Sequence, residues 1–271
     1  MGLANSYNVP IPNETTYAEV VSLNDYKKIK EVKEKDVIKY NKDGSIKKTT
    51  SNKKKGESSE VYAFRTKEEI DAMLNVFNNH IENATTKTNK KLWCRNKMLF
   101  IIGMNIGIRG SDLCRLKWID ILYDDFTFRD TKKICPKKTE NKGKFVTIAF
   151  NDRVKKTIME YIEKYPIEDL NDYIFKSKKG NHIKRVSIGE MLKKVAKEAN
   201  IKQNINSHSL RKTYGYWTYK SAENKSEALA KLQYGFGHCS MKDTMKYIGI
   251  AQESISEFNS TIDLGGESSL Y

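Results

Sequence analysis

The stretch HSLRKTYGYWTYKSAENKSEALAKLQYGFGHCSMKDTMKY, residues 208–247, decides how this 271-residue chain is interpreted. It opens with His208 and Arg211, which lie three residues apart and therefore on one face of an expected helix. It closes with His238, which follows a glycine, and with Tyr247 nine residues later. A guanidinium, two imidazoles and a phenol suit a phosphodiester under attack, because they bind its oxygens, move protons and form a covalent bond.

A second arginine motif lies upstream, in GIRGSDL at residues 107–113. Arg109 follows the predicted helix stop at Gly107, and Ser111 is expected to cap a short helix over 112–118. An arginine between two helix ends is held rigidly, with its fork aimed inward. Asp112 is expected to support this arginine rather than to bind a metal.

The three motifs, in this order, resemble those of the tyrosine recombinases, the phage-integrase family, over roughly residues 61–258. The resemblance implies an α+β, mainly helical catalytic fold with a small antiparallel sheet that carries a lysine hairpin. In this family the catalytic lysine stands on such a hairpin, usually as a Lys-Thr pair. Lys138 precedes Thr139 and is therefore the expected catalytic lysine, with the other hairpin lysines as alternatives: Lys137, Lys142 and Lys144.

Alternating and helical patterns place the remaining elements. Strands are expected at 126–128, 133–135, 145–148 and 172–175, with the polar hairpin 137–144 between the second and third. Helices are expected after capping residues, as in Thr66-x-x-Glu69. They cover 67–79, 92–105, 152–165 (capped by Asn151), 188–199 (Ser187), a helix from His208 (Ser207), 224–234 and one from Met241 (Ser240), and an amphipathic tail helix covers 252–264.

Residues 1–60 differ in composition from the rest of the chain. Between Lys27 and Lys55 there are twelve lysines and four acidic residues, with too few apolar residues for a core. We therefore expect a basic, polar extension or linker over 1–60, and the catalytic domain with its C-terminal helix over 61–271. The helical core-binding domain of most relatives is expected to be absent or truncated, unless the chain is a fragment.

The resemblance also implies a mechanism and partners. Arg109 and Arg211 would clamp the phosphate, and His208 and His238 would manage protons. Lys138 would act as the general acid, and Tyr247 as the nucleophile. The expected partner is double-stranded DNA, bound by a homo-tetramer on two DNA sites, without metal or cofactor. Two alternatives share these features: a type IB topoisomerase, and a DNA-binding protein that does not cleave.

Composition agrees with a polyanionic partner, since the formal net charge is +15. The four cysteines show neither C-x-x-C spacing nor paired histidines, so neither a disulfide framework nor a zinc site is expected. The sequence contains no apolar run of membrane-spanning length and no signal-peptide pattern, so a cytoplasmic location is expected.

Overall fold

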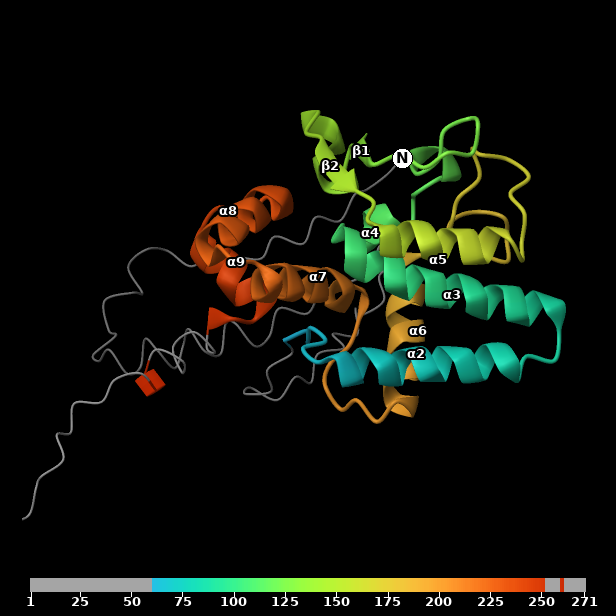
Figure 1. The fold of residues 1–271 in the computed structure, drawn as a ribbon, viewed down its shortest axis with the longest axis horizontal. Helices are drawn as coiled ribbons and strands as arrows, with labels where there is room; N and C mark the ends of the chain where they lie inside the picture. Colours follow the sequence, from blue (N-terminus) through green and yellow to red (C-terminus); the bar gives the residue numbers. More distant parts are fainter. Residues whose placement is uncertain (1–59, 252–258, 261–271) are drawn as a thin grey trace, which may run out of the picture. The chain divides into compact units, whose positions relative to one another are not determined.

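Helix α3 (Lys87–Ile106) is the element around which the other helices pack (Figure 1). Its residues 98–102 are five consecutive apolar residues, and all of them are buried. A helix of this kind needs neighbours on every face. The neighbours of α3 are α2 (Lys67–Glu82), α5 (Asp152–Ile162) and α7 (Ser207–Ser221).

The computed structural model describes residues 60–251 and 259–260. These residues belong to Ser58–Tyr271, the second of two units into which the chain divides, the first being Met1–Glu57. The predictions for the N-terminal extension and the tail helix therefore fall outside the described residues, apart from Glu60 and the pair 259–260. Among the described residues, no helix combines the length and apolar character needed to cross a membrane.

The other elements complete a mainly helical domain with one small sheet. They are α4 (Gly110–Leu113), the 3-10 helix η2 (Trp118–Asp120), β1 (Thr131–Ile134), the 3-10 helix η3 (Lys137–Lys142), β2 (Val146–Ala149), α6 (Arg185–Glu198), α8 (Lys225–Phe236) and α9 (Met241–Ile248).

The two strands form the expected antiparallel hairpin, in which Thr131 pairs with Ala149 and Ile134 pairs with Val146. The connection is the 3-10 helix η3 rather than a simple polar turn. The strands expected at 126–128 and 172–175 are wrong, because each makes only an isolated bridge within the described chain. Their backbone groups pair with the loop around η2 instead of with a second strand.

Three predicted caps are confirmed and three are wrong. Side chains cap α2, α5 and α9 as expected; the capping residues are Thr66, Asn151 and Ser240. Helix α8 was expected to begin at Asn224, which instead caps it with its side chain. The expected caps Ser111, Ser187 and Ser207 all lie inside helices, whose N-cap positions are Arg109, Lys184 and Asn206. In α7, for example, the Asn206 side chain accepts the His208 N–H, and Ser207 is buried.

Several helix boundaries also differ from the prediction. Helix α3 begins at Lys87 rather than 92, because the Thr86 side chain accepts the Asn89 N–H. The helix expected over 112–118 stops at Leu113, since the backbone N–H of Trp118 donates to Asp172 (3.1 Å).

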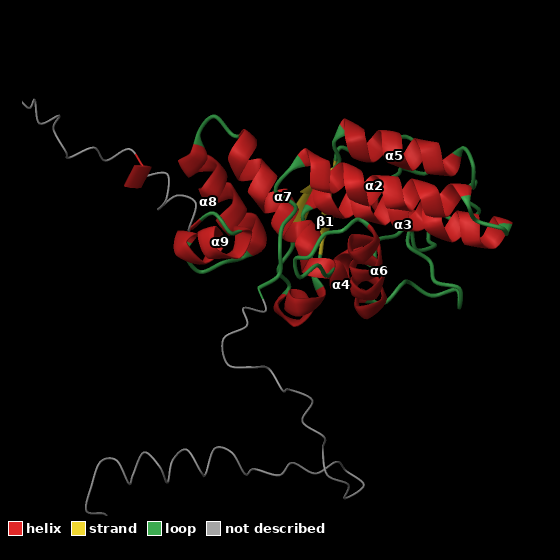
Figure 2. Ribbon diagram, turned by 90° about the horizontal axis from the view of Figure 1, so that it is seen from below, coloured by secondary structure: helices red, strands yellow, loops and turns green. Residues whose placement is uncertain are grey.

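The core consists of two clusters that α7 joins. The larger cluster fills the space between α2, α3, α5 and α6 and includes Leu210. The smaller one includes Tyr216, Phe236 and Ile248, from α7, α8 and α9. Figures 1 and 2 show α8 and α9 beside one another at one end of the domain, with α7 leading to them. Arg211 is buried between the two clusters, so α7 carries it to their junction.

Candidate active site

The turn between α3 and α4 places Arg109. Gly107 ends α3 in the left-handed conformation (φ 64°), and the ring of Tyr214 fills the space beside it. A Cβ atom on Gly107 would lie 2.2 Å from the Tyr214 Cδ1 atom, so a larger residue does not fit there. Two residues later, Arg109 donates from Nη2 to the carbonyl oxygen of Phe236 (3.2 Å).

Arg211 reaches the same carbonyl from α7. Its Nη1 donates to the Gly107 oxygen (2.7 Å) and its Nη2 to the Phe236 oxygen (3.2 Å). Its guanidinium carbon lies 4.1 Å from the centre of the Phe236 ring. Burial lowers the pKa of Arg211 to about 10, with Arg109 acting in the same direction and Tyr247 and Asp112 in the opposite one. Two guanidinium groups are thus held side by side by one main-chain oxygen.

The two histidines flank these arginines. His208 stands half-buried at the start of α7; burial lowers its pKa, and the nearby arginines lower it further, with Arg185 the largest of them. His238 follows the C-cap of α8, and its Nδ1 lies 3.1 Å from the Thr244 hydroxyl. Burial and Arg211 also lower the pKa of His238. Both imidazoles are therefore neutral near pH 7 and able to accept a proton.

Tyr247 packs against the same residues from α9. Its ring lies 5.0 Å from the ring of His238 and 5.5 Å from that of Phe236, edge to face in both pairs. Its hydroxyl is buried and makes no hydrogen bond to any described residue. Burial raises the pKa of Tyr247, and the charge of Arg211, close by but outside hydrogen-bonding geometry, opposes that shift. The phenol is thus held next to positive charge without a competing partner.

Asp112 connects the arginine motif to the lysine hairpin. Its Oδ1 accepts the backbone N–H of Lys137 (2.9 Å), at the first residue of η3. Lys138 follows on the exposed side of η3. Among the described residues it makes no hydrogen bond or ion pair with the two arginines, the histidines or Tyr247, so the structure does not bring Lys138 together with them. Asp112 fixes the base of the hairpin and leaves Lys138 free to solvent.

Several residues that lie at this site belong to none of the sequence motifs. Lys212 directly follows Arg211, is buried, and lies with its Nζ 5.5 Å from the centre of the Tyr247 ring. Its position four residues after His208 on one helix face was a usable signal. The Phe236 carbonyl and Arg185 gave no comparable signal, because their roles depend on how distant segments meet.

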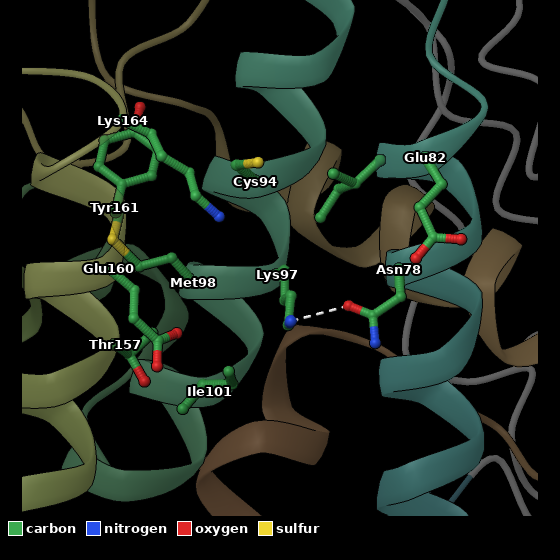
Figure 3. Close-up of a pocket in the computed structure, with 11 residues that line it drawn as sticks. Asn78, Glu82, Cys94, Lys97, Met98, Ile101, Thr157, Glu160, Tyr161 and Lys164 are labelled. Atoms are coloured by element: carbon green, nitrogen blue, oxygen red, sulfur yellow. Dashed lines mark hydrogen bonds between the residues drawn. The ribbon is translucent and has the colours of Figure 1, made fainter.

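A separate pocket of about 230 Å³ lies between α2, α3 and α5. Figure 3 shows Lys97 donating to Asn78 across it (2.7 Å), with Glu160 and Lys164 on the opposite wall. None of the predicted site residues lines this pocket. The candidate active site is therefore the junction of α4, α7, α8 and α9.

Comparison with known proteins agrees with this architecture. The probable integrase/recombinase YoeC of Bacillus subtilis (strain 168) is 30% identical over 161 residues, which cover 59% of this chain and 80% of YoeC. A tyrosine recombinase of Thermosipho africanus (strain TCF52B) is 24% identical over 190 residues, 70% of this chain and 58% of that protein. The crystal structure of XerA recombinase has a TM-score of 0.54 at 17% identity, covering 78% of this chain and 66% of XerA.

The similarity to XerA confirms the expected fold class. The model of the family described as "Phage integrase family" matches residues 64–254, well over half of the chain and all of the elements that carry the candidate site. The chain therefore belongs to the phage integrase family of tyrosine recombinases.

Proposed function

We propose that this chain is a site-specific DNA recombinase that cuts and rejoins DNA through a 3′-phosphotyrosine at Tyr247. One observation carries the proposal: Arg109 and Arg211 both donate to the Phe236 carbonyl, beside Tyr247. Two cations held together repel each other, and an anionic phosphodiester between them removes that repulsion. The guanidinium forks also match the non-bridging oxygens of a phosphate better than an ammonium does.

The chemistry follows from the protonation states of the site. In the first step the Tyr247 oxygen bonds to phosphorus and the bond from phosphorus to the 5′ oxygen breaks. A neutral histidine, His208 or His238, accepts the phenol proton. Lys138 stands exposed on its hairpin, and in the proposed reaction it reaches the bound DNA to donate a proton to the departing 5′ oxygen. The arginines stabilise the charge on the five-coordinate phosphorus. In the second step a 5′-hydroxyl from another strand attacks the phosphotyrosine, and the protons return.

The partners follow from the reaction. The substrate is double-stranded DNA, and exchange between two duplexes requires four active tyrosines, so the proposed assembly is a homo-tetramer on two sites. The proposed location is the cytoplasm, as expected from the sequence. The basic composition supports contact with phosphates, which fixes a protein on DNA without reading its sequence.

The test uses the full-length protein and a pool of nicked duplexes in which a central segment has random sequence. Cleavage next to the nick releases a short strand and traps the protein on the DNA. We expect a covalent adduct in the presence of excess EDTA, a common sequence among the captured duplexes, and no adduct with Tyr247→Phe. Adducts without a common sequence would indicate a topoisomerase, and their complete absence would indicate a DNA-binding protein that does not cleave.

A further inference from the structure

Lys212 is a buried cation beside the proposed nucleophile that the reaction described above does not use. Only 6% of its surface is exposed. Its Nζ lies 5.5 Å from the centre of the Tyr247 ring, within the range of a cation–π contact. The Lys212 ammonium therefore lies over the ring of Tyr247, the proposed nucleophile.

A buried ammonium is unfavourable unless a carboxylate compensates it. Glu60 supplies that carboxylate, since its Oε1 lies 3.0 Å from Lys212 Nζ. Glu60 is far from Lys212 in sequence and stands at the beginning of the described chain. The pair therefore joins the segment that enters the domain to the helix that carries Arg211.

The entering segment, residues 60–65, makes further polar contacts along the same path. The Phe64 N–H donates to the Thr213 hydroxyl (2.9 Å), and its carbonyl accepts from Trp217 Nε1 (3.0 Å). Arg65 donates from Nη2 to the oxygen of Gly249, the C-cap of α9 (3.0 Å). Ala63 of this segment also packs in the apolar cluster that contains Ile248, and a cavity of about 130 Å³ remains between the segment and the end of α9.

We propose that Lys212 is a positioning residue for Tyr247, and that Glu60 holds it in place, so that the entering segment 60–65 helps to set where the nucleophile stands. This inference rests on the proposed function. The ammonium restrains the ring from one face, and the Arg65 contact restrains the end of the same helix. Loss of either partner of the ion pair loosens the phenol without removing any group that touches the phosphate.

The first experiment measures single-turnover cleavage by the full-length protein on two substrates. One is the natural phosphodiester, and the other has sulfur in place of the bridging 5′ oxygen. A thiolate leaves without needing a proton, since a thiol has a pKa of about 8.5. A variant that lacks the general acid is therefore rescued by sulfur, and one with a misplaced nucleophile is not.

We expect Lys212→Met to cleave both substrates roughly 10- to 100-fold more slowly than wild type, because misplacing a reactive group by about 1 Å can cost about 100-fold in rate. Lys212→Arg keeps the charge and should recover most of the rate. Lys194→Met is the matched control, because Lys194 also pairs with a carboxylate (Glu198) and lies over an aromatic ring (Trp93), away from Tyr247. Its rate should equal that of wild type. Wild-type cleavage by Lys212→Met, or a loss confined to the oxygen substrate, would overturn the inference.

The second experiment is a double-mutant cycle that adds Glu60→Gln. Because the Glu60 side chain is exposed, the single variant Glu60→Gln also tests the ion pair with Lys212 if Lys212→Met does not fold. We expect Glu60→Gln to lower the Tm, because the Lys212 ammonium loses its carboxylate, and to slow cleavage several-fold at a temperature where the variant is fully folded. The double variant should be no slower than Lys212→Met alone. An unchanged rate for Glu60→Gln, or losses that multiply in the double variant, would overturn the inference.

If wild type forms no adduct, the proposed function fails as well. If wild type is active and these variants match it, only the positioning role fails.

Discussion

Arg211 is the residue on which the contacts of the candidate site converge. It bonds to the end of α3 and to the end of α8, and its charge acts on both Tyr247 and His238. Because its planar fork spans two carbonyl oxygens, a lysine at this position reaches only one of them. The side chain thus orders the site before any phosphate arrives.

We expect Arg211→Lys to lower the cleavage rate by at least about 100-fold, the loss typical when a transition-state donor is removed. DNA binding should remain, because many other cations contact phosphates. Quenched-flow assays of adduct formation measure the rate, and fluorescence anisotropy measures binding. Arg153→Lys, on the exposed side of α5, serves as the control and should react at the wild-type rate. Equal rates for the two variants would remove Arg211 from the reaction.

The histidines give a pH dependence of stability with a defined sign. Folding lowers the pKa values of His208 and His238 below the ordinary 6.5, so the unfolded chain binds protons more readily. Their neutral forms favour the fold above about pH 6.5, and this contribution falls as the pH drops through that value. We expect the Tm of wild type to fall between about pH 7.5 and 5.5 more steeply than that of the His208→Gln/His238→Gln variant. Parallel curves in differential scanning calorimetry would contradict this.

At the scale of elements, the turn between α3 and α4 is the most constrained connection near the site. Gly107 and Gly143 both adopt positive φ, of 64° and 58°. They differ in their surroundings, because Tyr214 crowds Gly107 whereas no atom lies within 4 Å of a Cβ on Gly143. Substitution by alanine at the two positions therefore separates the conformational strain from the steric clash.

We expect Gly143→Ala to lower the free energy of unfolding by about 1 kcal/mol, the strain of a left-handed alanine. Gly107→Ala should lower it by more than twice that amount, because the Tyr214 ring must also move, and it should slow cleavage by displacing Arg109. Chemical denaturation and adduct assays measure the two effects. Equal destabilisation by the two substitutions would show that the Tyr214 ring moves aside at no cost in free energy.

The elements also show which features a sequence predicts. Thr66 and Ser240 were recognisable caps because the bond from the side chain to the third helical residue is local. Ser187 and Ser207 looked equally suitable, yet the extended residue that begins each helix lies at 184 and 206. The residue at which a helix begins depends on how the rest of the domain holds the preceding loop, and a short sequence motif does not predict this.

At the scale of the whole molecule, the candidate site is the place where two apolar clusters meet. The motifs predicted that Arg109, Arg211, His238 and Tyr247 come together, and the fold brings them around the Phe236 carbonyl. They did not predict the contact between Glu60 and Lys212, because 152 residues separate the two and neither belongs to a motif. The sequence motifs thus predict the reactive residues, whereas the contacts that hold those residues in place depend on tertiary packing.

The last prediction concerns the unit Met1–Glu57, whose lysines we expect to contact DNA phosphates. Removing residues 1–57 keeps Glu60 and its ion pair, so the thermal unfolding of the remaining chain should be unchanged. DNA binding should weaken at low salt and depend less on salt, because each lysine that neutralises a phosphate adds about 0.9 to the slope of log affinity against log salt.

A full-length variant with glutamine in place of the twelve lysines between Lys27 and Lys55 is the matched control for chain length. It should reproduce the shallower salt dependence of the truncated protein. Preference for the captured sequence should persist in both variants, since lysines that contact phosphates do not read base edges. If truncation instead abolishes sequence preference while the glutamine variant retains it, the segment acts as a folded clamp on the duplex. Amide protons in 1–57 would then exchange slowly, as hydrogen-bonded helices require.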